Sequence, residues 1–179
     1  MGGFVALLRG INVGGHRKVP MAELRAVAAG LGLAKVRTYV ASGNLVFESD
    51  EEGPALERRL EGAIAERFGF DVDVIVRSAE QWRGLHDGNP LAEESAREPS
   101  KVMMTIGRQP ATDAAVSALR ARASANERVE RAGGALWLYF GDGAGRSKLA
   151  AAPAGKEIWT TRNWRTVATL KGMLDDPAG

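Results

Sequence analysis

The sequence contains no cysteine, which excludes disulfide bonds, thiolate catalysis and cysteine-ligated metals. Its two histidines, His16 and His86, form no H-E-x-x-H motif, and no G-x-S-x-G motif accompanies a serine, so zinc hydrolysis and serine nucleophilic catalysis are both disfavoured. The longest apolar run near the start, Phe4 to Leu8, is far shorter than the roughly 20 residues that span a bilayer. We therefore expect a cytoplasmic protein without a membrane partner, a metal or a cofactor.

The net charge is only +2, which does not by itself indicate a nucleic-acid partner. Its distribution is uneven: residues 1–77 are neutral, residues 78–99 carry two basic and five acidic residues, and residues 100–179 carry twelve and seven. The first 22 residues contain three basic side chains and no acidic one. Two interpretations explain this pattern equally well. The charges belong either to solvated helix faces or to two basic surfaces that meet on one anionic ligand.

The first 77 residues predict the order β-α-β-β-α-β, which is the split βαβ arrangement of ferredoxin-like domains. Short apolar or alternating runs predict four strands, near residues 4–9, 36–40, 45–47 and 72–76. Two stretches with apolar residues at i, i+3 and i+4 follow Pro20 and Pro54, and proline is favoured in the first turn of a helix. We expect helices at both places.

A second, diverged copy is expected after an acidic connector. Its predicted elements are a strand at 102–106, a helix from about 112, a hairpin of 128–131 with 135–140, a helical turn at 147–149, a strand at 158–161 and a final helix. The predicted division is 1–77 for the first half, 78–99 for a connector with a short helix, 100–174 for the second half and 175–179 for a tail. The expected fold class is α+β, with two ferredoxin-like halves packed together.

Topology brings two distant segments together. A right-handed crossover makes the first two strands parallel, so both finish at the same end of the sheet. The loop from Gly10 to Lys18 and the hairpin turn at Ser42, Gly43 and Asn44 should therefore be neighbours.

Four motifs point to a family. They are Leu7-Leu-Arg-Gly-Ile-Asn-Val-Gly-Gly15 with Lys18-Val-Pro-Met21, Thr38-Tyr-Val-Ala-Ser-Gly-Asn44, Gly145-Arg-Ser-Lys-Leu149, and Thr160-Thr-Arg-Asn-Trp-Arg-Thr166. Together they resemble a bacterial family of uncharacterised proteins, the domain-of-unknown-function family 1697. The segment from Ala150 to Lys156 departs from that family, because relatives tend to have a longer helical stretch there. The resemblance supports the α+β fold class and implies no activity.

The candidate ligand-binding residues lie in four segments. They are Arg9, Gly10, Asn12, Gly14, Gly15, His16 and Lys18, then Ser42 and Asn44, then Ser147 and Lys148, and finally Arg162 and Asn163. Glycine dihedrals let backbone N–H groups turn toward an anion, and the basic side chains supply charge. A tight strand-to-helix turn, a hairpin turn and helix caps explain the same residues structurally.

Two function classes follow. The first is a binding protein for a small phosphorylated or anionic ligand, a nucleotide or a phospho-metabolite, at the loop end of the first sheet. The second is a small-molecule enzyme in which the same basic residues hold the anion and His16 acts as acid or base. A nucleic-acid-binding module ranks lower, because Leu45-Val-Phe47 does not resemble the aromatic strand on which RNA-binding sheets stack bases. The oligomeric state stays open.

Overall fold

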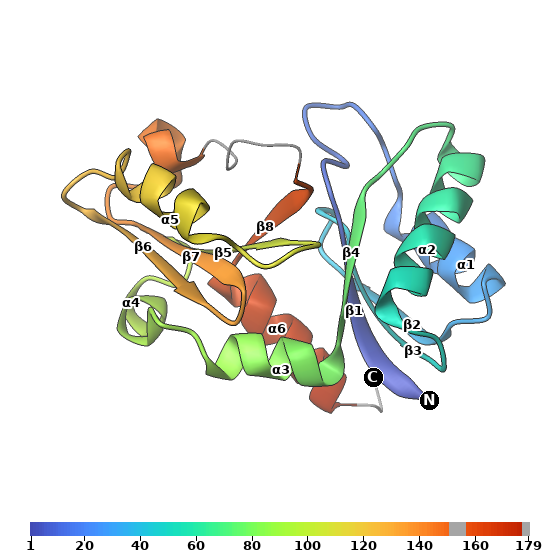
Figure 1. Cartoon of the computed structure of the whole chain (residues 1–179). Coiled ribbons are helices and arrows are strands. Elements are labelled where there is room, and N and C mark those ends of the chain that lie inside the picture. The colour runs from blue at the N-terminus through green and yellow to red at the C-terminus, as the bar shows by residue number, and fades with distance from the viewer. Residues whose placement is uncertain (151–156, 177–179) are drawn as a thin grey trace. The chain divides into compact units, whose positions relative to one another are not determined.

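The chain is α+β, with two four-stranded antiparallel sheets and helices (Figure 1). The computed structural model describes residues 1–150 and 157–176. Contacts divide the chain into two compact units. The first comprises Met1–Arg83 together with the chain from Leu170 onward, and the second comprises Gly84–Thr169.

The first unit has the predicted ferredoxin-like order. Its elements are β1 (Gly2–Leu8), α1 (Met21–Gly30), β2 (Ala34–Tyr39), β3 (Asn44–Ser49), α2 (Gly53–Phe68) and β4 (Val74–Ser78). The strand order in the sheet is β2-β3-β1-β4. Because β3 pairs antiparallel with both β1 and β2, these two strands run in the same direction and finish at the same end of the sheet.

Helices α1 and α2 cover one face of this sheet, as Figure 1 shows. Alternate residues of β1, Phe4, Ala6 and Leu8, point into the core between them, together with Leu24 of α1 and Leu60 of α2. Burying a large apolar side chain of this kind contributes about 1.5–3 kcal/mol, so the alternation in β1 fixes which face the helices cover.

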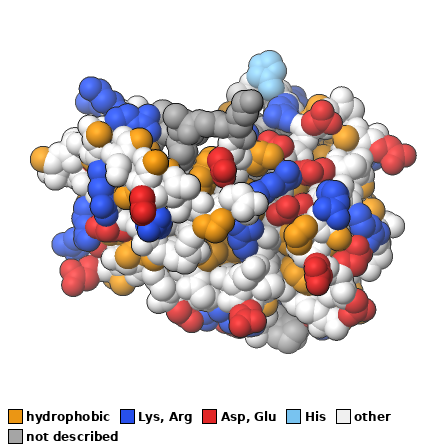
Figure 2. Space-filling view, in the orientation of Figure 1, with side chains coloured by type: hydrophobic (Ala, Val, Ile, Leu, Met, Phe, Trp, Pro, Cys, Tyr) orange, Lys and Arg blue, Asp and Glu red, His pale blue; other side chains and the backbone are white. Residues whose placement is uncertain are grey.

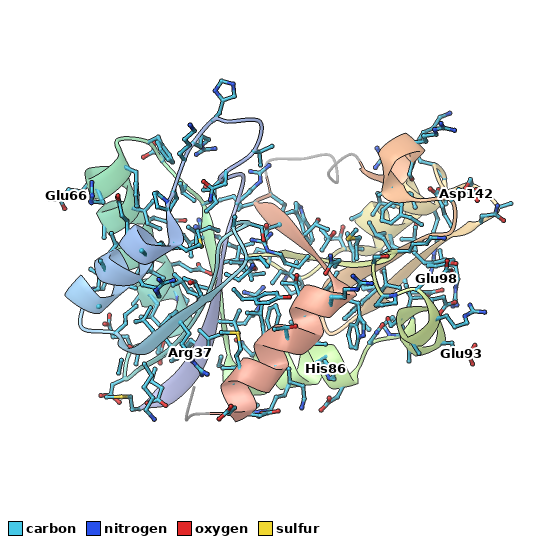
Figure 3. All side chains as sticks on the ribbon, turned by 180° about the vertical axis from the view of Figure 1, so that it is seen from behind. Arg37, Glu66, His86, Glu93, Glu98 and Asp142 are labelled. Carbon is cyan, nitrogen blue, oxygen red and sulfur yellow. The ribbon has the colours of Figure 1, made fainter. Side chains whose placement is uncertain are left out.

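The opposite face of the sheet receives the end of helix α6 (Trp164–Asp175). A Cβ atom placed on Gly3 would lie 3.4 Å from Leu174 and 3.5 Å from Ala79. The Arg37 guanidinium donates hydrogen bonds to the carbonyl oxygens of Met173, at 2.6 Å, and Asp176, at 2.9 Å (Figure 3). A cation on the last carbonyls of a helix satisfies free acceptors and favours the helix dipole.

Two carboxylates of α2 cover the exposed edge of β4. Glu57 accepts a hydrogen bond from the backbone N–H of Val76, and Glu61 accepts one from that of Val74, each at 2.9 Å. Unpaired N–H groups on an edge strand can pair with a strand of another molecule. Here the two carboxylates accept hydrogen bonds from these N–H groups in place of such a strand.

The second unit repeats the strand order, as β6-β7-β5-β8. Its elements before α6 are α3 (Ala79–Asp87, which begins in the first unit), α4 (Ala92–Arg97), β5 (Val102–Gly107), α5 (Asp113–Arg120), β6 (Glu127–Ala132), β7 (Ala135–Phe140), the short 3-10 helices η1 (Ala144–Arg146) and η2 (Lys148–Ala150), and β8 (Trp159–Asn163). Helix α5 packs Val116 and Leu119 against Leu136, Leu138 and Phe140 of β7.

One detail differs from the expected elements. The acidic connector contains two helices, α3 and α4, instead of one. The helical turn expected at 147–149 is present: between β7 and β8 the described residues form η1 and η2, whereas the first unit has the long helix α2 at the equivalent place. The Ala-, Gly- and Pro-rich segment from residue 151 to 156 and the end of the predicted tail, 177–179, lie outside the described residues.

Candidate functional site

The loop between β1 and α1 is longer than its topology requires. It spans twelve residues, 9–20, whereas the equivalent connection between β5 and α5 spans five, 108–112. Strand-to-helix connections are typically about 2–6 residues long. In Figure 1 the long loop, in dark blue, extends beyond the end of the sheet. The second unit thus closes the same topology without a glycine-rich segment, so a simple turn does not account for this loop.

Residues 12–17, in the middle of the loop, form a tight turn that we call the finger. The N–H of His16 donates to the carbonyl oxygen of Val13 at 3.0 Å, and one step below it the N–H of Asn12 donates to that of Arg17 at 3.1 Å. Positive φ angles occur at five loop positions: Gly10 (67°), Asn12 (54°), Gly14 (58°), Gly15 (78°) and Arg17 (50°). Two consecutive left-handed residues define the tight turn at the tip, and glycine adopts that conformation without steric cost.

The Asn12 side chain ties this finger to the β2–β3 hairpin. Its Nδ2 donates to the carbonyl oxygens of Val19, at 3.0 Å, and Ala41, at 2.7 Å, while its Oδ1 accepts from the N–H of Val19 at 2.8 Å. The contact with Ala41 confirms that the loop and the hairpin turn are neighbours. With its amide committed to backbone groups, Asn12 positions the loop.

The hairpin turn fits against the end of β1 only with glycine at position 43. Gly43 has a φ of 87°, and its carbonyl oxygen accepts from the N–H of Leu8 at 2.8 Å. A Cβ atom there would lie 2.7 Å from Cδ1 of Ile11 and 2.8 Å from Cβ of Leu8. The close approach of two backbones therefore explains this glycine.

Asn44, predicted as a ligand-binding residue, is fully buried. Its Nδ2 donates to the carbonyl oxygen of Tyr39 at 2.8 Å and to Oγ of Ser42 at 3.1 Å. Asn44 therefore fixes the shape of the hairpin, and of this pair only Ser42 reaches the surface.

The basic residues of the loop differ in what they contact. Arg9 forms an ion pair with Asp73 at 3.2 Å, and the Arg17 guanidinium lies over the Phe70 ring, 5.4 Å from its centroid. His16 and Lys18 are exposed, and their side chains form no hydrogen bond or ion pair with the residues that the structure describes. These two side chains are available to a ligand without displacing an internal partner.

Two aliphatic side chains stand exposed at the same end of the sheet. Val13, at the finger tip, is 66% exposed, and Val40, in the hairpin turn, is 48% exposed. Val40 has a φ of 50°, which is unusual for a β-branched residue and costs roughly 1–3 kcal/mol. Full burial of valine contributes about 1.5–3 kcal/mol, so the half burial of this side chain is at most comparable with the strain and gives no net reason for valine at this position.

The candidates in the second unit mostly have structural partners. Ser147 Oγ accepts from the N–H of Leu149 at 2.9 Å, and Asn163 Oδ1 accepts from the N–H of Thr166 at 3.0 Å, which caps the start of α6. Lys148 is exposed. Trp164 stacks on His86 with a centroid distance of 4.7 Å.

Arg162 lies on β8 and is only 8% exposed. Its Nη1 donates to Oγ1 of Thr160 and to the carbonyl oxygen of Thr161, both at 2.8 Å. Burial lowers the pKa of Arg162 to about 10. The guanidinium is therefore buried and hydrogen-bonded to neighbouring residues of its own strand, and it is not a surface cation.

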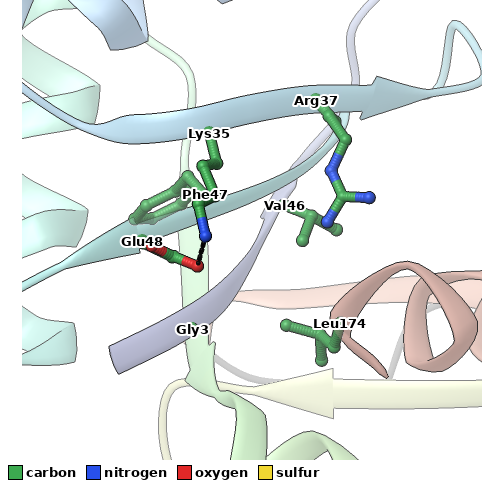
Figure 4. Close-up of a pocket in the computed structure, with 7 residues that line it drawn as sticks. All are labelled: Gly3, Lys35, Arg37, Val46, Phe47, Glu48 and Leu174. Atoms are coloured by element: carbon green, nitrogen blue, oxygen red, sulfur yellow. Dashed lines mark ion pairs between the residues drawn. The ribbon is translucent and has the colours of Figure 1, made fainter. Parts of the chain in front are cut away.

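A further cavity in the first unit is too small for a metabolite. It has a volume of about 30 Å³ and lies among Gly3, Arg37, Val46 and Leu174, beside an ion pair of Lys35 with Glu48 at 3.0 Å (Figure 4). About 10–15 Å³ accommodates one water molecule, so this space has room for water and not for a nucleotide.

The described residues contain no group of three His, Asp or Glu side chains placed to hold a metal ion. Within the same residues, no helix is both long and apolar enough to cross a membrane. On the face that Figure 2 shows, basic and acidic side chains are interspersed. No continuous basic surface of the kind that tracks a nucleic-acid backbone is visible on that face.

The sequence patterns did not single out Val13 and Val40 at this end of the molecule, and they indicated Arg17 only as one of the basic residues of the loop. Arg17 lies between the two stretches of the first motif, Leu7–Gly15 and Lys18–Met21, and its contact with Phe70 depends on the fold. The left-handed backbone of Val40 has no local signal, because valine is not a residue that turn rules place at such a position.

Comparison with known proteins places the chain in a family. The model of a family described as a protein of unknown function, DUF1697, matches residues 1–137. The chain belongs to the DUF1697 family. The matched part contains the whole β1–α1 loop and the β2–β3 hairpin, whereas the candidates from Ser147 onward lie beyond it.

A solved structure is similar over almost its full length. The conserved bacterial protein SP0830 from Streptococcus pneumoniae is 27% identical, with a TM-score of 0.78 over 97% of this chain and 98% of that chain. No curated protein matches the sequence. The comparisons thus support the fold and the family and name no ligand.

Proposed function

We propose that this DUF1697 protein binds a small phosphorylated ligand, a nucleotide or a phospho-metabolite, at the loop end of the first sheet. The observation that carries the proposal is the twelve-residue β1–α1 loop, for which the second unit uses five residues. An insertion that the topology does not need, wound into a defined conformation and clamped by Asn12, is typical of a binding loop.

The chemistry of the loop suits an anion. Lys18 supplies an exposed charge, and His16 supplies an exposed imidazole that can donate a hydrogen bond. Among the described residues, the N–H groups of Gly14 and Gly15 have no hydrogen-bond partner, so they can also donate to a phosphate oxygen. Helix α1 begins directly after the loop, and its start at Pro20 has no side-chain cap, which leaves its first N–H groups available.

The enzyme alternative has less support. A histidine that acts as general base is normally oriented by a third group, such as a carboxylate. The described residues place no hydrogen-bond partner on the His16 ring. Asp73, a carboxylate that contacts this loop, already forms an ion pair with Arg9. The same geometry therefore fits binding better than proton transfer.

The nucleic-acid alternative also has less support. RNA-binding sheets of this topology expose one face, on which aromatic side chains stack bases. In the first unit that face is occupied near Gly3 by Leu174 and Ala79, and the strand residues Val5, Leu7 and Val46 are buried. The loop end remains the available surface.

The test is a thermal shift of the wild type and of Lys18→Ala. The panel contains inorganic phosphate, sulfate, nucleotides and sugar phosphates. A ligand at 100 times its Kd stabilises the folded state by about 2.7 kcal/mol, which for a chain of this size raises Tm by roughly 5–10 °C. We expect a shift in the wild type that shrinks in Lys18→Ala and falls as salt rises, because the loop is exposed and its charges are screened.

The matched control is Arg58→Ala, which removes an exposed cation from α2 in the same unit. It should keep the wild-type shift. The proposal fails if no compound raises Tm, or if Lys18→Ala and Arg58→Ala respond alike.

A further inference from the structure

Val13 and Val40 are exposed aliphatic side chains in the two segments that Asn12 joins, the basic loop and the β2–β3 hairpin turn. We infer that the ligand of this site carries an apolar body next to its anionic group, and that these two valines contact that body. The inference rests on the proposed anion site and adds the class of ligand: an amphiphilic phosphate, in place of inorganic phosphate or a wholly polar sugar phosphate.

The two valines are held in adjoining segments. Val13 follows Asn12, and Val40 precedes Ala41, and the 2.7 Å hydrogen bond from Asn12 Nδ2 to the Ala41 carbonyl oxygen joins the residues beside them. Each is largely exposed, at 66% and 48%. Because the two segments are tied by this hydrogen bond, the aliphatic side chains that they carry are held in place before a ligand arrives, which lowers the entropic cost of binding.

Stability of the fold does not explain Val40. Its positive φ is one that glycine, asparagine or aspartate adopts far more easily. A half-exposed valine therefore occupies a place where polar turn residues are the stable choice. A contact with something outside the chain supplies a reason for an aliphatic side chain here.

The basic side chains near Val13 and Val40 indicate which class of ligand would bind. In the finger, Val13 lies opposite His16 and Asn12 lies opposite Arg17, and the exposed Lys18 follows Arg17 in the chain. An apolar contact bordered by cations is complementary to a molecule with an anionic end and an apolar end. A nucleotide base and an alkyl chain both satisfy this description, and the experiment separates them.

The experiment compares four probes by titration calorimetry: inorganic phosphate, ribose 5-phosphate, adenosine monophosphate and hexyl phosphate. They are titrated into the wild type, Val13→Thr, Val40→Asn and the double variant. Threonine keeps the shape of valine, and asparagine tolerates the left-handed backbone, so both variants should fold. We expect adenosine monophosphate or hexyl phosphate to bind the wild type roughly tenfold more tightly than ribose 5-phosphate, with the better of the two naming a ring or a chain.

In the double variant that advantage should vanish, while inorganic phosphate binds as to the wild type. The inference is wrong if all phosphates bind the wild type alike, or if the valine variants keep the tenfold preference. Failure of every phosphate to bind the wild type would overturn the anion site itself, so the two failures are distinct.

Discussion

Replacing Asn12 by alanine tests whether its amide holds the loop end together. The substitution removes three hydrogen bonds, two to the carbonyl oxygens of Val19 and Ala41 and one from the N–H of Val19. At about 1 kcal/mol for each bond, and less for the exposed one, the expected loss is roughly 2–3 kcal/mol. Alanine also tolerates the left-handed backbone of this position less well than asparagine, which adds to the loss.

The assay is urea and thermal unfolding followed by circular dichroism. The expected loss lowers Tm by roughly 4–12 °C for a chain of this size. The control is Asn126→Ala, which removes a single exposed hydrogen bond to Asp142 and should lower Tm by no more than about 4 °C. Asn12→Asp should be worse than Asn12→Ala, because a carboxylate oxygen would face two carbonyl oxygens.

Two results would refute this reasoning. If Asn12→Ala and Asn126→Ala lower Tm equally, the three bonds add nothing beyond an ordinary surface contact. If Asn12→Asp is as stable as the wild type, the side chain does not face the carbonyl oxygens of Val19 and Ala41 as described.

Two further predictions concern other parts of the fold. Gly43→Ala should cost about 2–4 kcal/mol in urea unfolding, since its Cβ meets the rigid Cβ of Leu8, whereas Gly15→Ala, with open space around it, should lose clearly less; equal losses would contradict the packing argument. Arg128→Ala should raise the pH of acid unfolding: burial alone raises the pKa of Glu94, but a backbone hydrogen bond and the Arg128 guanidinium outweigh it and lower that pKa, so the stabilisation is present above the ordinary carboxyl range and is lost on acidification. An unchanged acid midpoint would show that this ion pair adds nothing.

Many elements of both units could be predicted because their signals are local. Pro54 marks the first turn of α2, and Gly69, with a φ of 80°, ends it. Glycines 133 and 134 mark the turn between β6 and β7 in the same way. Even the meeting of loop and hairpin followed from strand direction alone, since parallel strands finish together.

The roles of individual side chains could not be predicted in this way. The sequence presents Asn12 and Arg9 as surface residues of a polar loop, yet their partners lie 29 and 64 positions further along the chain. Whether such a side chain faces a ligand or a backbone carbonyl depends on distances that only the fold sets. The bounds of β4 differ for a related reason: alternation predicts 72–76, but pairing with β1 extends the strand over Val74–Ser78.

The two carboxylates on the edge of β4 also match the repeat distance of a helix to that of a strand. Glu57 and Glu61 are four residues apart on a helix, a rise of about 6 Å, and Val74 and Val76 are two residues apart on a strand, about 6.6 Å. The two spacings nearly coincide, so side chains one helical turn apart on α2 face N–H groups one strand repeat apart on β4. A slip of β4 by a single residue would present the N–H groups of its neighbouring residues to the same carboxylates, so the apolar side chains of β4 that face the core, and not these bonds, set its register. Helix α2 therefore covers the edge of a strand that follows it in the chain with two side chains from a single helical turn.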